Sequence, residues 1–265
     1  MTGFEILFAY CLLGVFAGTM AGLLGVGGGL IIVPALIAIW QSSAIGGIYE
    51  MQLAIGTSLA SIVLTSVASV RAHHLRGSVQ WDTFWRLTPG VVLGAWLGAA
   101  LATQMSGEAL KSIFGVFELL VAAQMAFGLR PAPHRGLPGR AGMTLVGSGI
   151  GAVSAIIGIG GGTMTVPFLS WCNVTIHKAV GTSAACGLPI AIGGAISYLV
   201  LGWNNVALPS WSAGFIYGPA LAGIVVTSML FAPLGAALAH RLSTVVLKRA
   251  FAGFLALLGV WMLTG

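Results

Sequence analysis

Two glycine-rich stretches have the composition expected of an anion-binding site. "GLLGVGGGLIIVPAL" covers Gly22–Leu36, and "AIIGIGGGTMTVPFL" covers Ala155–Leu169, 133 residues later. In each stretch three consecutive glycines precede a segment that can restart as a helix, at Leu30 and at Thr163. The start of a helix presents unpaired backbone N–H groups and the positive end of the helix dipole, and both attract anions. The spacing therefore predicts that a small anion binds at these two helix starts.

A second pair of motifs places hydroxyl groups at matched positions. "AIGTS" covers Ala54–Ser58 and "AVGTS" covers Ala179–Ser183. These hydroxyls can hydrogen-bond an oxyanion without adding a fixed charge, or they can cap a helix or bond to a backbone carbonyl four residues earlier. The predicted substrate-binding residues are Gly27, Gly28, Gly29, Thr57, Ser58, Gly160, Gly161, Gly162, Thr163, Thr182 and Ser183.

One acid is a candidate for a different role. Glu118 lies within an otherwise apolar stretch, and an acid inside a membrane segment is a functional candidate because burying it is costly. We therefore treat Glu118 as a possible proton-linked group, although its repeat counterpart, Leu255, is apolar. The three cysteines are scattered, and no histidine or cysteine cluster accompanies them. We expect no metal, no cofactor and no enzymatic activity.

The composition decides which class of protein must position these residues. Of 265 residues, 58% are hydrophobic and only 6% are charged, with a mean hydropathy of +1.02. A soluble domain carries roughly 25% charged residues. The chain is therefore predicted to be an all-α polytopic protein of the cell's inner membrane, with the lipid bilayer as its partner. Its eleven bases are expected to set membrane topology and not to bind nucleic acid.

Hydropathy divides the chain into ten apolar stretches. Most approach the ~20 residues that a spanning helix needs. The segments that follow the two triple glycines are shorter in their clearly apolar parts, Leu30–Trp40 and Thr163–Cys172. This makes them candidates for half-helices or re-entrant segments. The stretches are 4–21, 30–48, 52–70, 87–104, 111–129, 141–157, 163–176, 179–201, 212–231 and 246–264.

The matched motifs indicate an internal duplication. Besides the glycine and "GTS" motifs, "GAALA" occurs at Gly98–Ala102 and again at Gly235–Ala239. The basic segment "RPAPHRGLPGR" separates the two halves. We predict a first transmembrane repeat over residues 1–129, a basic cytoplasmic linker over 130–140 and a second transmembrane repeat over 141–265.

The bases predict the orientation of the two repeats. If each glycine-containing segment enters and leaves the membrane on the same side, ten of the eleven bases lie on one face, and only Lys111 lies on the other. The positive-inside rule makes the basic face cytoplasmic. Each repeat is then a glycine-broken helical hairpin followed by three crossings. Three is odd, so the second repeat must be inverted relative to the first, as in many transporters.

Two other interpretations of the glycines are weaker. "GAWLG" at Gly94–Gly98 and "GSGIG" at Gly147–Gly151 are small-xxx-small patterns that let helices pack closely, and the triple glycines could serve the same purpose. We expect Gly94→Ala, in such a packing motif, to cost much less than a substitution in the triple glycines. A dinucleotide-binding loop is excluded, because the final glycine of G-x-G-x-x-G is missing and no soluble βαβ unit surrounds the motif.

The doubled motif resembles a known family. "GVGGGLIIVP" and "GIGGGTMTVP", each followed by a "GTS" element, are similar to the sulfite exporter TauE/SafE family of membrane permeases, over nearly the whole chain. The resemblance implies transport, as a probable exporter, of sulfite or small organosulfur anions such as sulfoacetate. The alternatives are a permease or channel for another small anion and a membrane assembly protein that transports nothing.

Overall fold

The computed structural model describes residues 3–24, 28–43, 45, 47–128, 136–239 and 244–265. Gly27, one of the predicted site residues, lies outside the described residues. The described chain is built almost entirely from helices. They are α1 (Gly3–Leu24), α2 (Gly29–Gln41), a short 3₁₀ helix η1 (Gly47–Tyr49), α3 (Glu50–Leu75), α4 (Trp81–Gln104), α5 (Gly107–Phe127), α6 (Arg140–Ile157), α7 (Gly162–Trp171), α8 (Ile176–Leu201), α9 (Gly218–Ala239) and α10 (Thr244–Thr264).

Eight helices in the described part of the chain are long and apolar enough to cross a membrane. This confirms the prediction of an all-α polytopic membrane protein. The helices α2 and α7 are shorter, with 13 and 10 residues. At 1.5 Å per residue, α2 extends about 20 Å, which is less than the ~30 Å hydrocarbon core. Both begin at the third glycine of a triple, one residue before the predicted restarts at Leu30 and Thr163.

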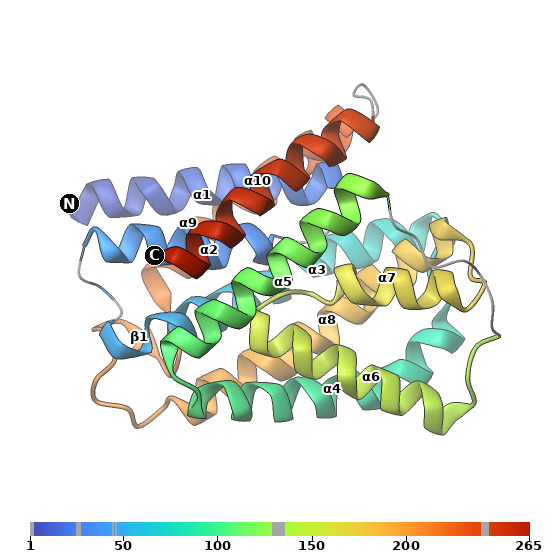
Figure 1. Cartoon of the computed structure of the whole chain (residues 1–265), viewed down its shortest axis with the longest axis horizontal. Coiled ribbons are helices and arrows are strands. Elements are labelled where there is room, and N and C mark those ends of the chain that lie inside the picture. Colours follow the sequence, from blue (N-terminus) through green and yellow to red (C-terminus); the bar gives the residue numbers. More distant parts are fainter. Residues whose placement is uncertain (1–2, 25–27, 44, 46, 129–135, 240–243) are drawn as a thin grey trace.

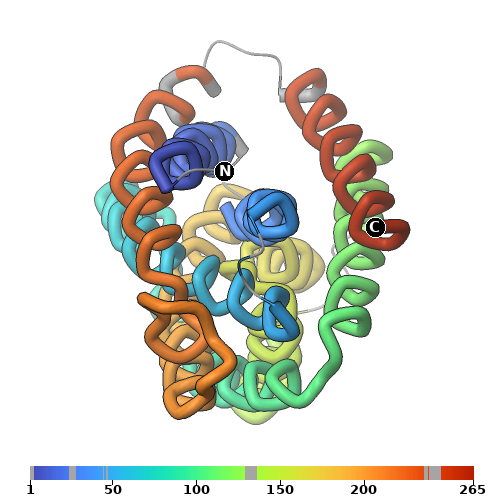
Figure 2. The backbone as a smooth tube through the Cα atoms, turned by 90° about the vertical axis from the view of Figure 1, so that its left-hand side faces the viewer, coloured from blue at the N-terminus to red at the C-terminus, as the bar shows by residue number. Residues whose placement is uncertain are grey.

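Helices α1–α5 of the first half pack against helices α6–α10 of the second half. The helix α1 packs along α9, α6 packs along α4, and α5 packs along α10. The long helices α3 and α8 contact each other, while α2 packs on α3 and α7 packs on α8. Figure 2 shows α2 and α7 in the interior, with α5 and α10 on one side of them. The two half-length helices are therefore surrounded by the long ones.

Equivalent elements of the two predicted repeats make equivalent contacts. The contact between α1 and α9 has its counterpart in the contact between α6 and α4. In Figure 1, α1 runs from left to right, whereas α6 runs from right to left. The start of α1, the end of α10 and the β1 strand lie at the left, and the α3–α4 connection, the end of α5 and the start of α6 lie at the right. The boundaries of the repeats and their orientation in the membrane remain predictions.

The close contact between α4 and α6 depends on glycines, which have no side chain to keep the helices apart. A methyl group added at Gly94 would overlap the backbone carbonyl oxygen of Ser148, and one added at Gly98 would lie 2.7 Å from the Cα of Ala152. This geometry counts against the expectation that Gly94→Ala costs much less than a substitution in the triple glycines, because the atoms that a new side chain would meet belong to a helix backbone. On the other side, methyl groups at Gly14 and Gly18 would lie 2.5 Å from the carbonyl oxygens of Ile224 and Ser228 in α9.

One predicted apolar stretch divides differently from the expectation. Residues 212–231 read as a single segment, but α9 begins only at Gly218. Before it, strands β1 (Ser212–Ala213) and β2 (Ile216–Tyr217) pair antiparallel in a small hairpin whose turn contains Gly214 at φ +53°. The hairpin residues Phe215 and Ile216 are buried, so hydropathy alone cannot separate them from the helix that follows.

Candidate functional site

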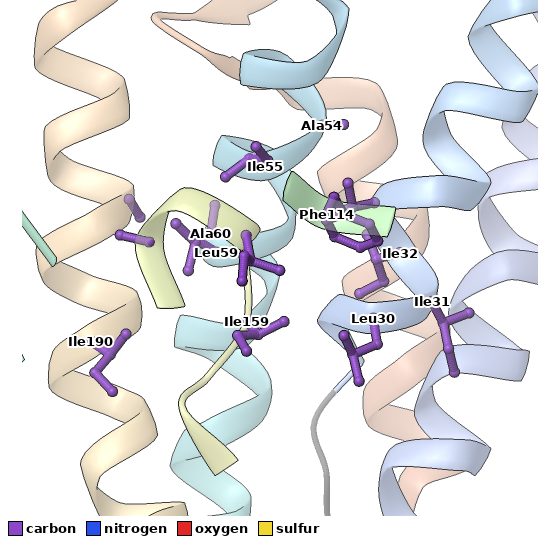
Figure 3. Close-up of a cluster of buried hydrophobic side chains, with 14 of the residues drawn as sticks. Leu30, Ile31, Ile32, Ala54, Ile55, Leu59, Ala60, Phe114, Ile159 and Ile190 are labelled. Atoms are coloured by element: carbon purple, nitrogen blue, oxygen red, sulfur yellow. The ribbon is translucent and has the colours of Figure 1, made fainter. Parts of the chain in front are cut away.

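The two glycine breaks contact each other inside the bundle. Gly29, the first residue of α2, lies directly against Gly158 and Ile159, which follow the end of α6. A methyl group at Gly29 would overlap the carbonyl oxygen of Gly158 and would lie 3.0 Å from the Cα of Ile159. Figure 3 shows the loop with Ile159 between Leu30 at the start of α2 and Ile190 on α8. The start of α2 thus lies against the loop that leads from α6 to α7.

The second break is fixed in place by hydrogen bonds. Gly158 ends α6 in the left-handed conformation, at φ +83°, and its N–H donates to the carbonyl oxygen of Ser154 at 2.8 Å. The hydroxyl of Ser58 on α3 donates to the carbonyl oxygen of Gly158 at 2.8 Å. Ser58 was predicted to hold substrate. In this structure its hydroxyl proton is donated to the glycine loop, and its substrate role stays a prediction.

The remaining glycines of the second break lie against α8. Gly187 on α8 approaches the carbonyl oxygen of Gly160, so that a methyl group at Gly187 would lie 2.7 Å from that oxygen. Gly161 adopts φ +72°, a conformation that side chains rarely allow. Its counterpart Gly28 has φ −78° and no such restriction. The two helix starts are therefore not equivalent in backbone conformation.

The two helix starts also differ in polarity. In the first, Leu30, Ile31 and Ile32 are almost fully buried apolar side chains. In the second, the hydroxyls of Thr163 and Thr165 are buried without a hydrogen-bond partner. Within the described residues, the hydroxyls of Ser154, Ser170 and Ser183 are also buried without a partner. Ser154 and Thr165 were not among the predicted site residues. A signal for them was present in the sequence, because the second glycine stretch has Ser154, Thr163 and Thr165 where the first has Ala21, Leu30 and Ile32.

The matched threonines connect the two halves of the chain. Thr57 on α3 accepts a hydrogen bond from the backbone N–H of Tyr217, 2.9 Å away, and donates to Leu53 of its own helix at 2.7 Å. Thr182 on α8 accepts from the backbone N–H of Gln80, also at 2.9 Å. Each bond ties the central helix of one half to the segment just before a helix of the other half. Burial raises the pKa of the Tyr217 phenol beside the first of these bonds.

We expect Thr57→Val and Thr182→Val to destabilise the protein whether or not ligand is present. Valine keeps the shape of threonine but leaves the N–H of Tyr217 or Gln80 without its acceptor. An unsatisfied buried donor costs about 1–3 kcal/mol. The free energy of unfolding, or the thermal midpoint in detergent, measures the loss. Thr88→Val is the matched control, since the Thr88 hydroxyl bonds only to Phe84 of its own helix. Equal midpoints for Thr57→Val and Thr88→Val would contradict this role.

Glu118 is enclosed by α5 and α10. Its side chain is fully buried, and both carboxylate oxygens are without a hydrogen-bond partner in the described part of the chain. Gly259 on α10 lies against it, with 3.2 Å between the Cβ of Glu118 and the point where a Gly259 side chain would begin. Phe114, one turn earlier on α5, lies beside Ile32 of α2 in Figure 3. The acid therefore lies on the face of α5 that contacts the interior.

A groove between α6 and α7 is of a different kind. It has a volume of about 380 Å³ and is open and apolar. Its lining residues are Val146, Gly149, Ile150, Met164, Pro167, Phe168 and Trp171. A groove without polar groups offers an anion nothing to bind, so the polar start of α7 is the better candidate for the site.

The sequence matches one protein family along almost its whole length. Residues 10–262 match the family described as sulfite exporter TauE/SafE. No solved structure matches the chain.

Curated relatives cover nearly the full chain as well. A probable membrane transporter protein of Haemophilus influenzae is 35% identical over 255 residues, which are 95% of this chain and 96% of the relative. A probable membrane transporter protein of Methanocaldococcus jannaschii is 26% identical over 95% of this chain and 93% of the relative. Bacillus subtilis YunE, also a probable membrane transporter protein, is 28% identical over 73% of this chain and 78% of the relative.

Proposed function

The chain belongs to the sulfite exporter TauE/SafE family, and we propose from this premise that it exports sulfite or a small organosulfur anion such as sulfoacetate. The family is one of membrane transporters, so the protein is a multi-pass membrane transporter and not an enzyme. The identity of the anion is the proposed part. It is supported by the kind of site that the chain can build.

The contact between the glycine breaks supports an anion site near the middle of the membrane. Gly29, at the start of α2, lies against Gly158, at the end of α6, and this irregular backbone is protected from lipid inside the bundle. Helix starts offer N–H donors to an anion and oppose a cation. We place substrate against the starts of the two broken helices, with hydroxyl groups as neutral donors. The residues proposed to contribute are Gly27, Gly28, Gly29, Thr57, Ser58, Gly160, Gly161, Gly162, Thr163, Thr182 and Ser183.

An inverted arrangement of two repeats would bring such helix starts together from opposite sides. The opposite directions of α1 and α6 and the matched contacts of the two halves support this arrangement. With the 71–86 and 130–140 segments in the cytoplasm and the 202–210 loop outside, ten of eleven bases face the cytoplasm. For an anion leaving a negative interior, the potential contributes about 2.3 kcal/mol per charge per 100 mV, which favours export.

Thiol labelling tests the proposed topology. Single cysteines are introduced by Gly136→Cys and Val206→Cys after the three native cysteines are replaced; both positions are exposed. In intact cells an impermeant thiol reagent should label the protein at position 206 and leave position 136 unlabelled until the cells are permeabilised. The two positions serve as controls for each other. Labelling at 136 from outside would contradict the inverted arrangement.

Flux through reconstituted protein tests the substrate. Proteoliposomes loaded with labelled sulfite should release it with saturable kinetics, faster than protein-free vesicles, and unlabelled sulfite should compete while amines and sugars do not. We also propose that Glu118 links transport to protons. If so, Glu118→Gln should remove the dependence of flux on a pH gradient and leave binding of sulfite intact. Protein that accelerates no oxyanion flux at any gradient would defeat the proposed function.

A further inference from the structure

Two buried hydroxyls face the start of α7 without a partner. Ser154, in the last turn of α6, and Thr165, in the first turn of α7, are both fully buried. Their hydroxyl oxygens lie 3.5 Å and 3.6 Å from the point where a side chain on Gly161 would begin. Neither hydroxyl makes a hydrogen bond within the described residues. Two polar groups that water does not reach are thus aimed at one point beside the cap of a broken helix.

A buried hydroxyl without a partner is costly. Removing a hydroxyl from water without replacing its hydrogen bond costs about 1–3 kcal/mol on the protein scale. A buried hydroxyl can avoid this cost by donating to its own helix, as Ser197 does to Gly193 and Thr57 to Leu53. A serine and a threonine could do the same at positions 154 and 165, but they do not. Two unpartnered hydroxyl donors beside one helix start are a pair that a ligand with acceptor oxygens complements.

The ligand that fits is an oxyanion. The first N–H groups of α7, on Gly162 and Thr163, have no acceptor within the helix, because the α-helical pattern reaches none before the fourth residue after the cap. Hydroxyl and N–H donors around one point complement a compact anion with several acceptor oxygens. Gly161 at φ +72° has no side chain to obstruct it.

The first half of the chain offers no equivalent. Aligning the two glycine motifs places Ala21, Leu30 and Ile32 opposite Ser154, Thr163 and Thr165. Leu30 and Ile32 are buried and apolar, and Gly28 takes a right-handed conformation. The start of α2 therefore contributes close packing, and the polar groups belong to α7.

We infer that the protein has a one-sided oxyanion site in which the hydroxyls of Ser154 and Thr165 and the first N–H groups of α7 bind the substrate. The inference rests on the proposed function, since it names ligand groups of that same anion site, and it assigns the two broken helices unequal roles. The δ1 methyl of Ile190 lies 2.5 Å from the point beside Gly161 that the hydroxyls face, so this side chain covers the site. Entry of the anion requires it to turn aside.

The test compares unfolding with and without ligand. Purified wild type, Ser154→Ala and Thr165→Val are melted in detergent at fixed ionic strength, with sodium sulfite or sodium sulfate as probe and sodium chloride as reference. Without oxyanion, the variants should melt at or above the wild-type temperature, because an unsatisfied hydroxyl is gone. The Kd for the oxyanion, from the concentration dependence of the shift, should rise roughly tenfold or more for each variant. Ser197→Ala and Thr88→Val, whose hydroxyls bond within their own helices, should keep the wild-type Kd within about twofold.

The outcomes separate this inference from the proposed function. Variants that bind oxyanion like the wild type, while sulfite flux persists, overturn the role of Ser154 and Thr165 and leave the transporter proposal standing. Weakened binding in both variants, with no flux in wild-type proteoliposomes, supports the site and defeats the transport proposal. A wild type that no oxyanion stabilises overturns the site, and the flux assay then decides the function independently.

Discussion

Gly29→Ala should prevent the two glycine breaks from meeting, and with that abolish transport. The added methyl group would overlap the carbonyl oxygen of Gly158 and lie 3.0 Å from the Cα of Ile159. These are backbone atoms, and Gly158 is also held by its own bond to Ser154 and by the hydroxyl of Ser58. The loop at Gly158 therefore cannot move away from Gly29 without straining these hydrogen bonds. We expect a loss of about 3 kcal/mol or more in unfolding free energy, at the upper end of overpacking effects. Thermal unfolding in detergent and sulfite flux measure it.

Gly28→Ala is the matched control for this prediction. Gly28 precedes Gly29 in the same motif, but its φ of −78° suits alanine. The nearest atom to an added methyl group would be the δ1 carbon of Ile32, 3.0 Å away at the flexible end of a side chain. We expect a cost below about 1.5 kcal/mol and a folded protein. If both alanine variants melt alike and transport alike, the contact between the breaks is not what holds the site.

Gly94→Ala should separate α4 from α6, the second large effect. Alanine improves the intrinsic stability of a helix by about 1 kcal/mol over glycine, so propensity alone predicts a gain. The structure predicts a loss, because the methyl group would overlap the carbonyl oxygen of Ser148 and lie 2.7 Å from its Cα. The two helices would have to move apart along their whole contact. We expect a net loss of about 2–3 kcal/mol, seen as a lower thermal midpoint.

Gly149→Ala isolates packing from propensity. Gly149 lies on α6 next to Ser148, but an added methyl group there would meet no atom within 4 Å. It should therefore be neutral or should stabilise the protein by up to about 1 kcal/mol. A midpoint for Gly94→Ala at or above that of Gly149→Ala would show that α4 and α6 do not approach as closely as the structure describes.

Local composition was sufficient to locate the broken helices. The apolar segments Leu30–Trp40 and Thr163–Cys172 correspond to α2 and α7 within one residue at each end. Glycine runs and hydropathy predict where these two helices begin and end, because the interruption of a helix and the start of the next depend on nearby residues. Residues 212–231 show the limit of hydropathy. Aromatic and aliphatic residues of the β1–β2 hairpin have the same apolar character as the helix after them.

The partners of the site residues could not be predicted in this way. Thr57 bonds to Tyr217, which is 160 residues away, and Thr182 bonds to Gln80, which is 102 residues away. A hydroxyl in an apolar helix looks the same whether it bonds across the bundle, to its own helix or to nothing. Ser154 therefore did not stand out among the small residues near the second glycine stretch. Its orientation toward Gly161 depends on the left-handed turns at Gly158 and Gly161, which lie beyond any local pattern.

The pairing of α1 with α9 determines when the protein can become complete during synthesis. Gly14 and Gly18 in α1 pack against Ile224 and Ser228, so the bare glycine face of the first helix has no native partner until about 210 more residues have been made. At roughly 5–20 residues per second, that interval lasts on the order of 10–40 s. During this time the face of α1 that carries Gly14 and Gly18 is suited to pack against other helices with small residues. We therefore expect the glycine face of α1 to be open to other helices that carry small residues until α9 has been made.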